Sequence, residues 1–231
     1  IIAYDTASAT WSMFFDGSDV GLGGAGARDV DAFYVMDNDS ILISIVGASS
    51  IPDVGNIDDS DIVMFTPTSL GTTTAGAFSL VFDGSDVSLT TNGEDVDAIY
   101  LTSTNALILS TAGGHNVGFG GSDEDLLLFT PTSTGANTAG TWVRYFDGSD
   151  IALNNGGDED VWGAWVDGSD IYLTMRGAFN SSGVSGDGSD IFLCANATTG
   201  NNSACGSASL YWDGSAFGIG AERTDGMQIR R

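Results

Sequence analysis

The feature that most constrains the fold of this chain is an internal repeat of about 65 residues. The string FDGSD begins at Phe15, Phe82 and Phe146, so that the copies lie 67 and 64 residues apart. A second string, DVDA, begins at Asp29 and Asp95 with a similar offset of 66 residues. A fixed period of this length is typical of supersecondary units that stack or close in a circle. The sequence therefore predicts one unit, repeated through most of the chain.

Each unit has the pattern of four short β-strands joined by turns. In the unit from Asp95, runs of β-branched, aromatic and leucine residues predict strands, and no segment has a helical period of useful length. Pro131 has no N–H to donate to a ladder, so we expect the third strand to end there. The four predicted strands are residues 97–102, 106–111, 125–130 and 140–146.

The two ends of the chain together supply most of a fourth unit. We therefore predict an all-β fold, a four-bladed β-propeller in one domain, with three complete blades and one composite blade closed by N- and C-terminal strands. An open solenoid or a stacked sandwich is the alternative. The composite blade is one strand short, so either it has three strands or a neighbouring molecule adds the fourth. The repeats are residues 29–94, 95–159 and 160–222, and the composite blade is residues 1–28 with 223–231.

The charge of the chain excludes two classes of partner. It has 31 acidic residues against six basic ones, which gives a formal net charge of −25. Such a field repels nucleic acid and anionic membranes. No apolar run approaches the roughly 18 residues that a membrane-spanning helix needs, so we expect no membrane insertion.

Acidic residues gather where one predicted blade passes to the next. Each FDGSD turn is followed, after a short loop, by a second acidic group, and carboxylates with turn carbonyls are the oxygen ligands that calcium prefers. Carboxylates so close repel one another without a cation. The alternative is that Asp-Gly and Ser-Asp merely form turns. The predicted calcium ligands are Asp16, Asp19, Asp29 and Asp31; Asp83, Asp86, Glu94, Asp95 and Asp97; and Asp147, Asp150, Asp158, Glu159 and Asp160.

Other acidic positions are expected to matter less for cation binding. In the last copy of the turn Ala216 replaces the second Asp, which should weaken a site there. Three further groups, within 58–61, 123–125 and 187–190, precede predicted third strands. We interpret them as solvated strand starts, with secondary cation sites as the alternative.

The two cysteines and the start of the chain favour an exported protein. Cys194 and Cys205 flank a loop of small residues, and we predict a disulfide between them. The chain begins at Ile1 rather than Met and carries no signal segment, which a processed, secreted chain would explain. We therefore expect an extracellular protein.

The side chains that most enzymes use are scarce. His115 is the single histidine, and we expect it to be exposed in a glycine-rich loop. A histidine-based zinc site would lack a second histidine, and no GxSxG is present. Trp11, Trp142 and Trp212 fall in predicted fourth strands, where repeated aromatic residues pack blade against blade. A sugar-stacking platform is the alternative interpretation of these tryptophans.

The string DVDA, LILST, DEDLLLFTP and FDGSD, in that order from Asp95 to Asp150, resembles the repeats of secreted bacterial β-propeller proteins found in large surface or extracellular chains. This resemblance covers nearly the whole sequence and implies a scaffold or binding module. We expect a non-enzymatic, calcium-binding structural subunit of an extracellular filament or surface layer, which self-associates, for example by strand addition. The alternatives are a lectin-like module that binds carbohydrate and, third, a calcium-dependent hydrolase.

Overall fold

The computed structural model describes residues 1–23, 26–154 and 156–230, and its regular structure is β-strand with short 3₁₀ turns. Three four-stranded antiparallel sheets form its main body. The first sheet contains β3 (Val30–Val35), β4 (Ile41–Ile45), β7 (Ile62–Ser69) and β8 (Ala75–Phe82). The second contains β9 (Val96–Leu101), β10 (Leu107–Thr111), β13 (Leu126–Ser133) and β14 (Ala139–Phe146). The third contains β15 (Val161–Asp167), β16 (Asp170–Met175), β19 (Ile191–Ala195) and β20 (Ser207–Trp212).

Smaller elements join these sheets. A terminal hairpin, formed by β1 (Ile2–Asp5) and β2 (Thr10–Met13), precedes the first sheet. Each sheet also carries a short hairpin between its second and third strands. These are β5 (Ser49–Ile51) with β6 (Gly55–Ile57), β11 (His115–Asn116) with β12 (Gly120–Gly121), and β17 (Phe179–Ser181) with β18 (Val184–Gly186). The FDGSD copies form 3₁₀ turns, η1 (Gly17–Val20), η2 (Ser85–Val87), η3 (Gly148–Ile151) and η4 (Gly214–Phe217).

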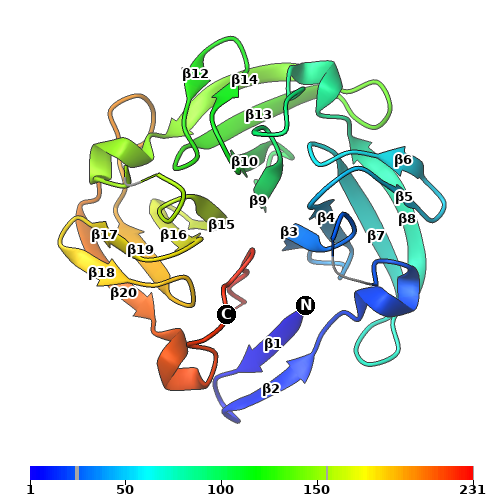
Figure 1. Ribbon diagram of the computed structural model, residues 1–231, viewed down its shortest axis with the longest axis horizontal. Helices are drawn as coiled ribbons and strands as arrows, with labels where there is room; N and C mark the ends of the chain where they lie inside the picture. The colour runs from blue at the N-terminus through cyan, green and yellow to red at the C-terminus, as the bar shows by residue number, and fades with distance from the viewer. Residues whose placement is uncertain (24–25, 155, 231) are drawn as a thin grey trace.

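The three sheets and the terminal hairpin lie around a common centre (Figure 1). The strands β3, β9 and β15 lie nearest that centre and contact one another, whereas β8, β14 and β20 lie at the periphery. Both ends of the chain come close to the centre: the C-terminus lies between the third sheet and the terminal hairpin, and the N-terminus lies at the inner end of β1. Segments far apart in sequence therefore meet there.

The core lies between neighbouring sheets. One buried cluster joins Ala32, Leu42 and Phe82 of the first sheet to Val96 and Phe129 of the second. A second cluster joins the second sheet to the third in the same manner. The β4 and β10 strands are buried along their whole length, which explains their continuous apolar sequence. The same packing between neighbouring sheets thus recurs with the sequence repeat.

The proline prediction was wrong. The β13 strand continues through Pro131 to Ser133, and Pro131 is paired with Gly140 of β14. The neighbouring β10 pairs with β13 only as far as Phe129. Pro131 therefore lies beyond the end of β10, so that its missing N–H interrupts no ladder on that side.

The disulfide prediction is confirmed. Cys194 on β19 is bonded to Cys205, with their Cα atoms 4.9 Å apart.

The prediction for His115 was wrong. His115 lies in the β11–β12 hairpin and is only 4% exposed, packed edge-on against Phe119. Its loop folds back as a hairpin over the sheet, which the glycine-rich sequence did not indicate. In the described part of the chain no helix has the length and apolar character to cross a membrane.

The predicted first strand of the composite unit is absent as a strand. Residues 224–230, which we call the C-terminal segment, have no strand assignment. Backbone hydrogen bonds still hold it beside the third sheet, from Thr224 N to Gly188 O and from Gly226 N to Trp162 O. The C-terminal segment therefore lies beside β15 and close to the centre (Figure 1).

Candidate functional site

The carboxylates of the FDGSD turns bind backbone N–H groups of the next sheet. The Asp86 carboxylate accepts a hydrogen bond of 2.9 Å from Thr138 N, and the Thr138 hydroxyl accepts one of 2.9 Å from Asp83 N. We call this reciprocal pair the junction clamp. The same clamp joins Asp19 and Asp16 to Thr74, and Asp150 and Asp147 to Ser203. The motif thus fastens the terminal hairpin to the first sheet, the first sheet to the second, and the second to the third.

The last copy of the turn lacks this clamp, and its sequence differs accordingly. Ala216 stands where the other copies have the second aspartate. The terminal hairpin, which lies beside this last turn, has only four residues, 6–9, between β1 and β2. At this junction the indole N–H of Trp11 donates to Phe217 O instead, at 3.0 Å. Trp142 makes the equivalent bond to Val87 O at 2.9 Å. These two tryptophans therefore join neighbouring sheets, as expected.

The acidic groups before the third strands also hold turns. Asp61, Asp125 and Asp190 are buried, and each accepts a hydrogen bond from the glycine N–H of the FDGSD or WDGSA turn in its own sheet. Burial raises the pKa of Asp61 to about 6. They were expected to be solvated; instead they are buried beside the turn glycines whose N–H groups they bind.

Two glutamates of the predicted calcium set have similar roles. Glu94 accepts hydrogen bonds from the backbone N–H groups of Thr90, Thr91 and Asn116. Glu159 accepts equivalent bonds from the N–H groups of Asn154 and Asn180. Each glutamate therefore fixes the loop after a 3₁₀ turn to a short hairpin.

Four further acids of that set meet at the centre of the molecule. Asp31 of β3 lies beside Asp95, and Asp97 of β9 lies beside Asp160, which precedes β15. We call these four residues the axial carboxylates. Asp97 and Asp160 are each 1% exposed, and Asp95 is 9% exposed. Both carboxylate oxygens of Asp97, and one each of Asp95 and Asp160, have no hydrogen-bond donor.

Burial and mutual repulsion disfavour the charged form of the axial carboxylates. Burial, and then the nearby Asp31, raises the pKa of Asp95 to about 9. Burial raises the pKa of Asp160 to about 7, and burial followed by the charge of Asp160 raises that of Asp97 well above its ordinary value. The clamp aspartates, the buried turn aspartates and the two loop glutamates have backbone N–H partners, so this cluster needs a separate explanation.

The structure does not bring together the calcium ligands that were predicted for each sheet junction. The turn aspartates lie in the clamps, the glutamates hold loops, four aspartates lie at the axis, and the side chains of Asp29 and Asp158 are exposed. Among the described residues, no three His, Cys, Asp or Glu side chains already form a metal-ligand group. Calcium binding at the sheet junctions stays a prediction.

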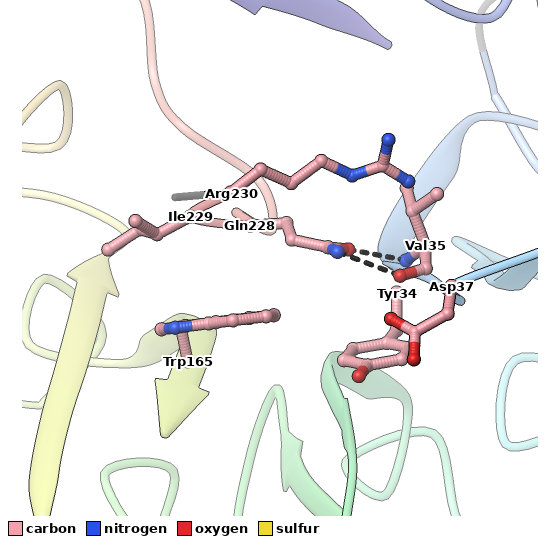
Figure 2. Close-up of a pocket in the computed structure, with 7 residues that line it drawn as sticks. All are labelled: Tyr34, Val35, Asp37, Trp165, Gln228, Ile229 and Arg230. Carbon is pink, nitrogen blue, oxygen red and sulfur yellow. Dashed lines mark hydrogen bonds between the residues drawn. The ribbon is translucent and has the colours of Figure 1, made fainter. Parts of the chain in front are cut away.

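The other end of the axis is aromatic. The rings of Tyr34, Tyr100 and Trp165, at equivalent positions of β3, β9 and β15, lie within 6.0 Å of one another by centroid. Figure 2 shows an open pocket beside Tyr34 and Trp165, of about 370 Å³, covered by Gln228 and Arg230. The sequence patterns singled out neither this cluster nor the pocket, although the aromatic residues recur with the repeat.

The C-terminal segment is fastened at this end by a side chain. The Gln228 amide donates to Val35 O at 2.7 Å and accepts from Val35 N at 2.5 Å (Figure 2). Arg230 forms an ion pair of 3.1 Å with Asp39. The Gln228 side chain thus makes hydrogen bonds with both the N–H and the C=O of Val35 in the first sheet.

The terminal hairpin has a free inner edge. The β1 strand pairs with β2, and no strand in the described residues pairs with its other side. In the three sheets the equivalent strands β7, β13 and β19 each pair with a second, buried strand on that side. Both β1 and β2 are largely exposed, with Ile2 at 55% and Met13 at 40%. We call this unpaired edge of β1 the open strand position.

Comparison with known proteins leaves the family of this chain undetermined. No family model and no curated protein matches it. Among solved structures it is similar to the extracellular domain of a putative one-component system from B. thetaiotaomicron, with 12% identity and a TM-score of 0.31. That match covers 98% of this chain and 33% of the other, so the chain spans about a third of its length.

Proposed function

We propose that the chain is a secreted four-bladed β-propeller that acts as a structural subunit of an extracellular assembly. In this proposal the three sheets are complete blades of one domain, and the terminal hairpin with the C-terminal segment is a fourth, incomplete blade. The observation that carries the proposal is the open strand position beside β1. A neighbouring subunit would fill it with one extended strand.

Two features of the incomplete blade support this occupant. An inner strand of a blade has one ladder partner, so the C-terminal segment cannot be a paired strand while the second position is open. The exposed edge of β1 likewise presents unpaired N–H and C=O groups, which are a template for strand addition. One missing strand thus accounts for both irregular elements.

The chemistry of the occupant follows from the other sheets. The strands at this position, β4, β10 and β16, are almost wholly buried and rich in Ile and Leu. An added strand of this kind would also cover Ile2, which is exposed at present. Burying it would stabilise the assembly in proportion to the apolar area removed from water.

The charge and the disulfide suit an extracellular setting. A disulfide persists in oxidising compartments, and a net charge of −25 resists non-specific aggregation of the monomer. Assembly would then depend on a directed contact such as strand addition. These features support the localisation that we propose but do not carry the structural role.

A synthetic peptide with the sequence of residues 105–111 tests the open position. It reproduces β10, and we expect it to bind, to raise the melting temperature and to protect the β1 amides from hydrogen exchange. A peptide of the same composition in scrambled order is the control. In the same series, light scattering after gel filtration should show association that rises with protein concentration and falls with added peptide. The proposal would be refuted if the protein stayed monomeric at every concentration and did not bind the peptide.

The pocket in Figure 2 favours one alternative, the lectin-like module. It combines the Tyr34 and Trp165 rings with the charged Asp37 and Arg230, a combination that suits sugar stacking and hydrogen bonding. Glycan-array binding by the monomer, lost in a Trp165→Ala variant that keeps its fold, would support this alternative over the assembly role.

A further inference from the structure

We propose that the axial carboxylates, Asp31, Asp95, Asp97 and Asp160, form a site for one divalent cation of the calcium class at the centre of the molecule. This site differs from the junction sites that the sequence suggests, because its ligands come from three different sheets. It is independent of the open strand position.

The first argument is hydrogen-bond accounting. The clamp aspartates, the buried turn aspartates and the loop glutamates have backbone N–H partners. Asp97 is only 1% exposed and has no N–H or hydroxyl donor for either oxygen, so that its contact is with the carboxyl group of Asp160. One oxygen each of Asp95 and Asp160 is also without a donor. A buried carboxylate without a donor is costly, and a bound cation or a proton has to compensate it.

The second argument concerns the neighbours of the Asp97 carboxyl group. The charges that act on it belong to Asp160, Asp31 and Asp95, which stand in or just before β15, β3 and β9. These inner strands contact one another around the axis. The Asp97 carboxyl group therefore lies close to carboxyl groups that come from the other two inner strands.

The third argument is the balance of charge. Asp225 of the C-terminal segment faces the same region, since its charge acts on Asp31. The guanidinium groups of Arg176 and Arg223 both lie over the Trp162 ring, at 5.6 and 5.9 Å from its centroid. If Asp225 and the four axial carboxylates were all ionised, the two arginines would leave an excess of three negative charges, which either protons or a bound cation must offset. Asp59 and Asp123 add to that excess, because their charges act on Asp95 and Asp160.

The ligand chemistry selects the class of cation. All the unpartnered atoms are carboxylate oxygens, which are hard ligands that favour calcium, magnesium or manganese over zinc or copper. Calcium tolerates irregular coordination of six to eight oxygens, so water would complete a set begun by four protein oxygens. The carboxylates now contact in two pairs, so binding requires their side chains to rotate toward one point.

Trp162 provides a direct readout. Its indole N–H donates to Asp160 Oδ2 at 3.0 Å, so this ring lies in contact with the site. Terbium substitutes for calcium and emits when a nearby tryptophan is excited. We expect tryptophan-sensitised terbium emission from the folded protein, displaced by calcium chloride, and a calcium-induced rise of several degrees in melting temperature.

The Asp97→Asn variant separates the possible outcomes. It removes one buried charge without changing the shape, so it should melt at a higher temperature than the parent in EDTA. It should also lose most of the calcium-induced shift and bind terbium at least about tenfold more weakly. Asp86→Asn, at a junction clamp, is the matched control and should keep the full calcium response.

Three results would overturn the proposal. They are an unchanged melting curve with millimolar calcium, terbium emission that Asp97→Asn leaves intact, or a calcium response that Asp86→Asn abolishes and Asp97→Asn does not. If Asp97→Asn does not fold, Asp160→Asn takes its place with the same expected loss of calcium response. Assembly state does not enter any of these measurements, so failure here leaves the proposed function standing.

Discussion

At the scale of residues, one amino acid serves in three different environments. Aspartate caps turns at the surface, holds glycine N–H groups beneath the turns, and faces other aspartates at the axis. What distinguishes these roles is the supply of N–H donors, since a carboxylate that accepts several backbone hydrogen bonds keeps its charge at modest cost. The same residue type without donors holds a proton or needs a cation.

Glu124 offers a test of buried acid chemistry away from the axis. Burial, with Asp123 alongside, raises its pKa to about 8, and it is 7% exposed. The folded state therefore retains a proton that the unfolded state has released, so stability should fall as pH rises from about 4.5 to 8. In Glu124→Gln this contribution disappears, and we expect the variant to be more stable at pH 8.5 by about 1 kcal/mol.

Thermal melts at pH 5 and pH 8.5 check this expectation. The exposed Glu222→Gln, also a loss of one glutamate, is the control and should shift the two curves little. Parallel pH profiles for the parent protein and Glu124→Gln would show that Glu124 does not titrate as its burial indicates.

At the scale of elements, the FDGSD turn matters through its clamp to the next sheet. Its glycine fits against the backbone of the strand below, because a Cβ on Gly84 would meet Ser60 O. Its second aspartate reaches the Thr or Ser of the following sheet. That partner residue was missed from the sequence, although Thr74 and Thr138 stand in the same TAG context.

Asp86→Ala should destabilise the protein by about 1–2 kcal/mol, because it leaves the Thr138 N–H without its charged acceptor. The loss should be the same in calcium and in EDTA, which denaturant melts in both buffers can show. Ala216→Asp is the matched control, since the terminal hairpin offers no partner and no gain is expected. A loss confined to the calcium buffer would instead place a cation at the junction.

At the scale of the whole molecule, the acidic surface works against the compact state. A net charge of −25 on 231 residues stores repulsion that dissolved ions screen over about 10 Å at 0.1 M. The open strand position and the axial carboxylates are features at this same scale. Each is formed by segments from opposite ends or different sheets of the chain.

Salt should therefore stabilise the protein even without divalent cations. In EDTA at pH 8, we expect the melting temperature to rise by several degrees between 0.02 M and 0.5 M sodium chloride. At about pH 2.5, where most carboxyl groups carry protons, the rise should largely vanish. An equal rise at both pH values would assign the effect to hydrophobic salting-out and not to charge screening.

The repeat by itself determined the all-β class and the four-strand units, because strand pattern and turn chemistry are local, and the two closely spaced cysteines determined the disulfide. The extension of β13 through Pro131 was not readable from the sequence, since it depends on where β10 stops. Nor could the sequence show which acids meet: Asp95 and Asp97 are two residues apart from one another but find their neighbours in Asp31 and Asp160. Only the tertiary structure decided that grouping, because burial and the supply of N–H donors depend on how the sheets surround the axis.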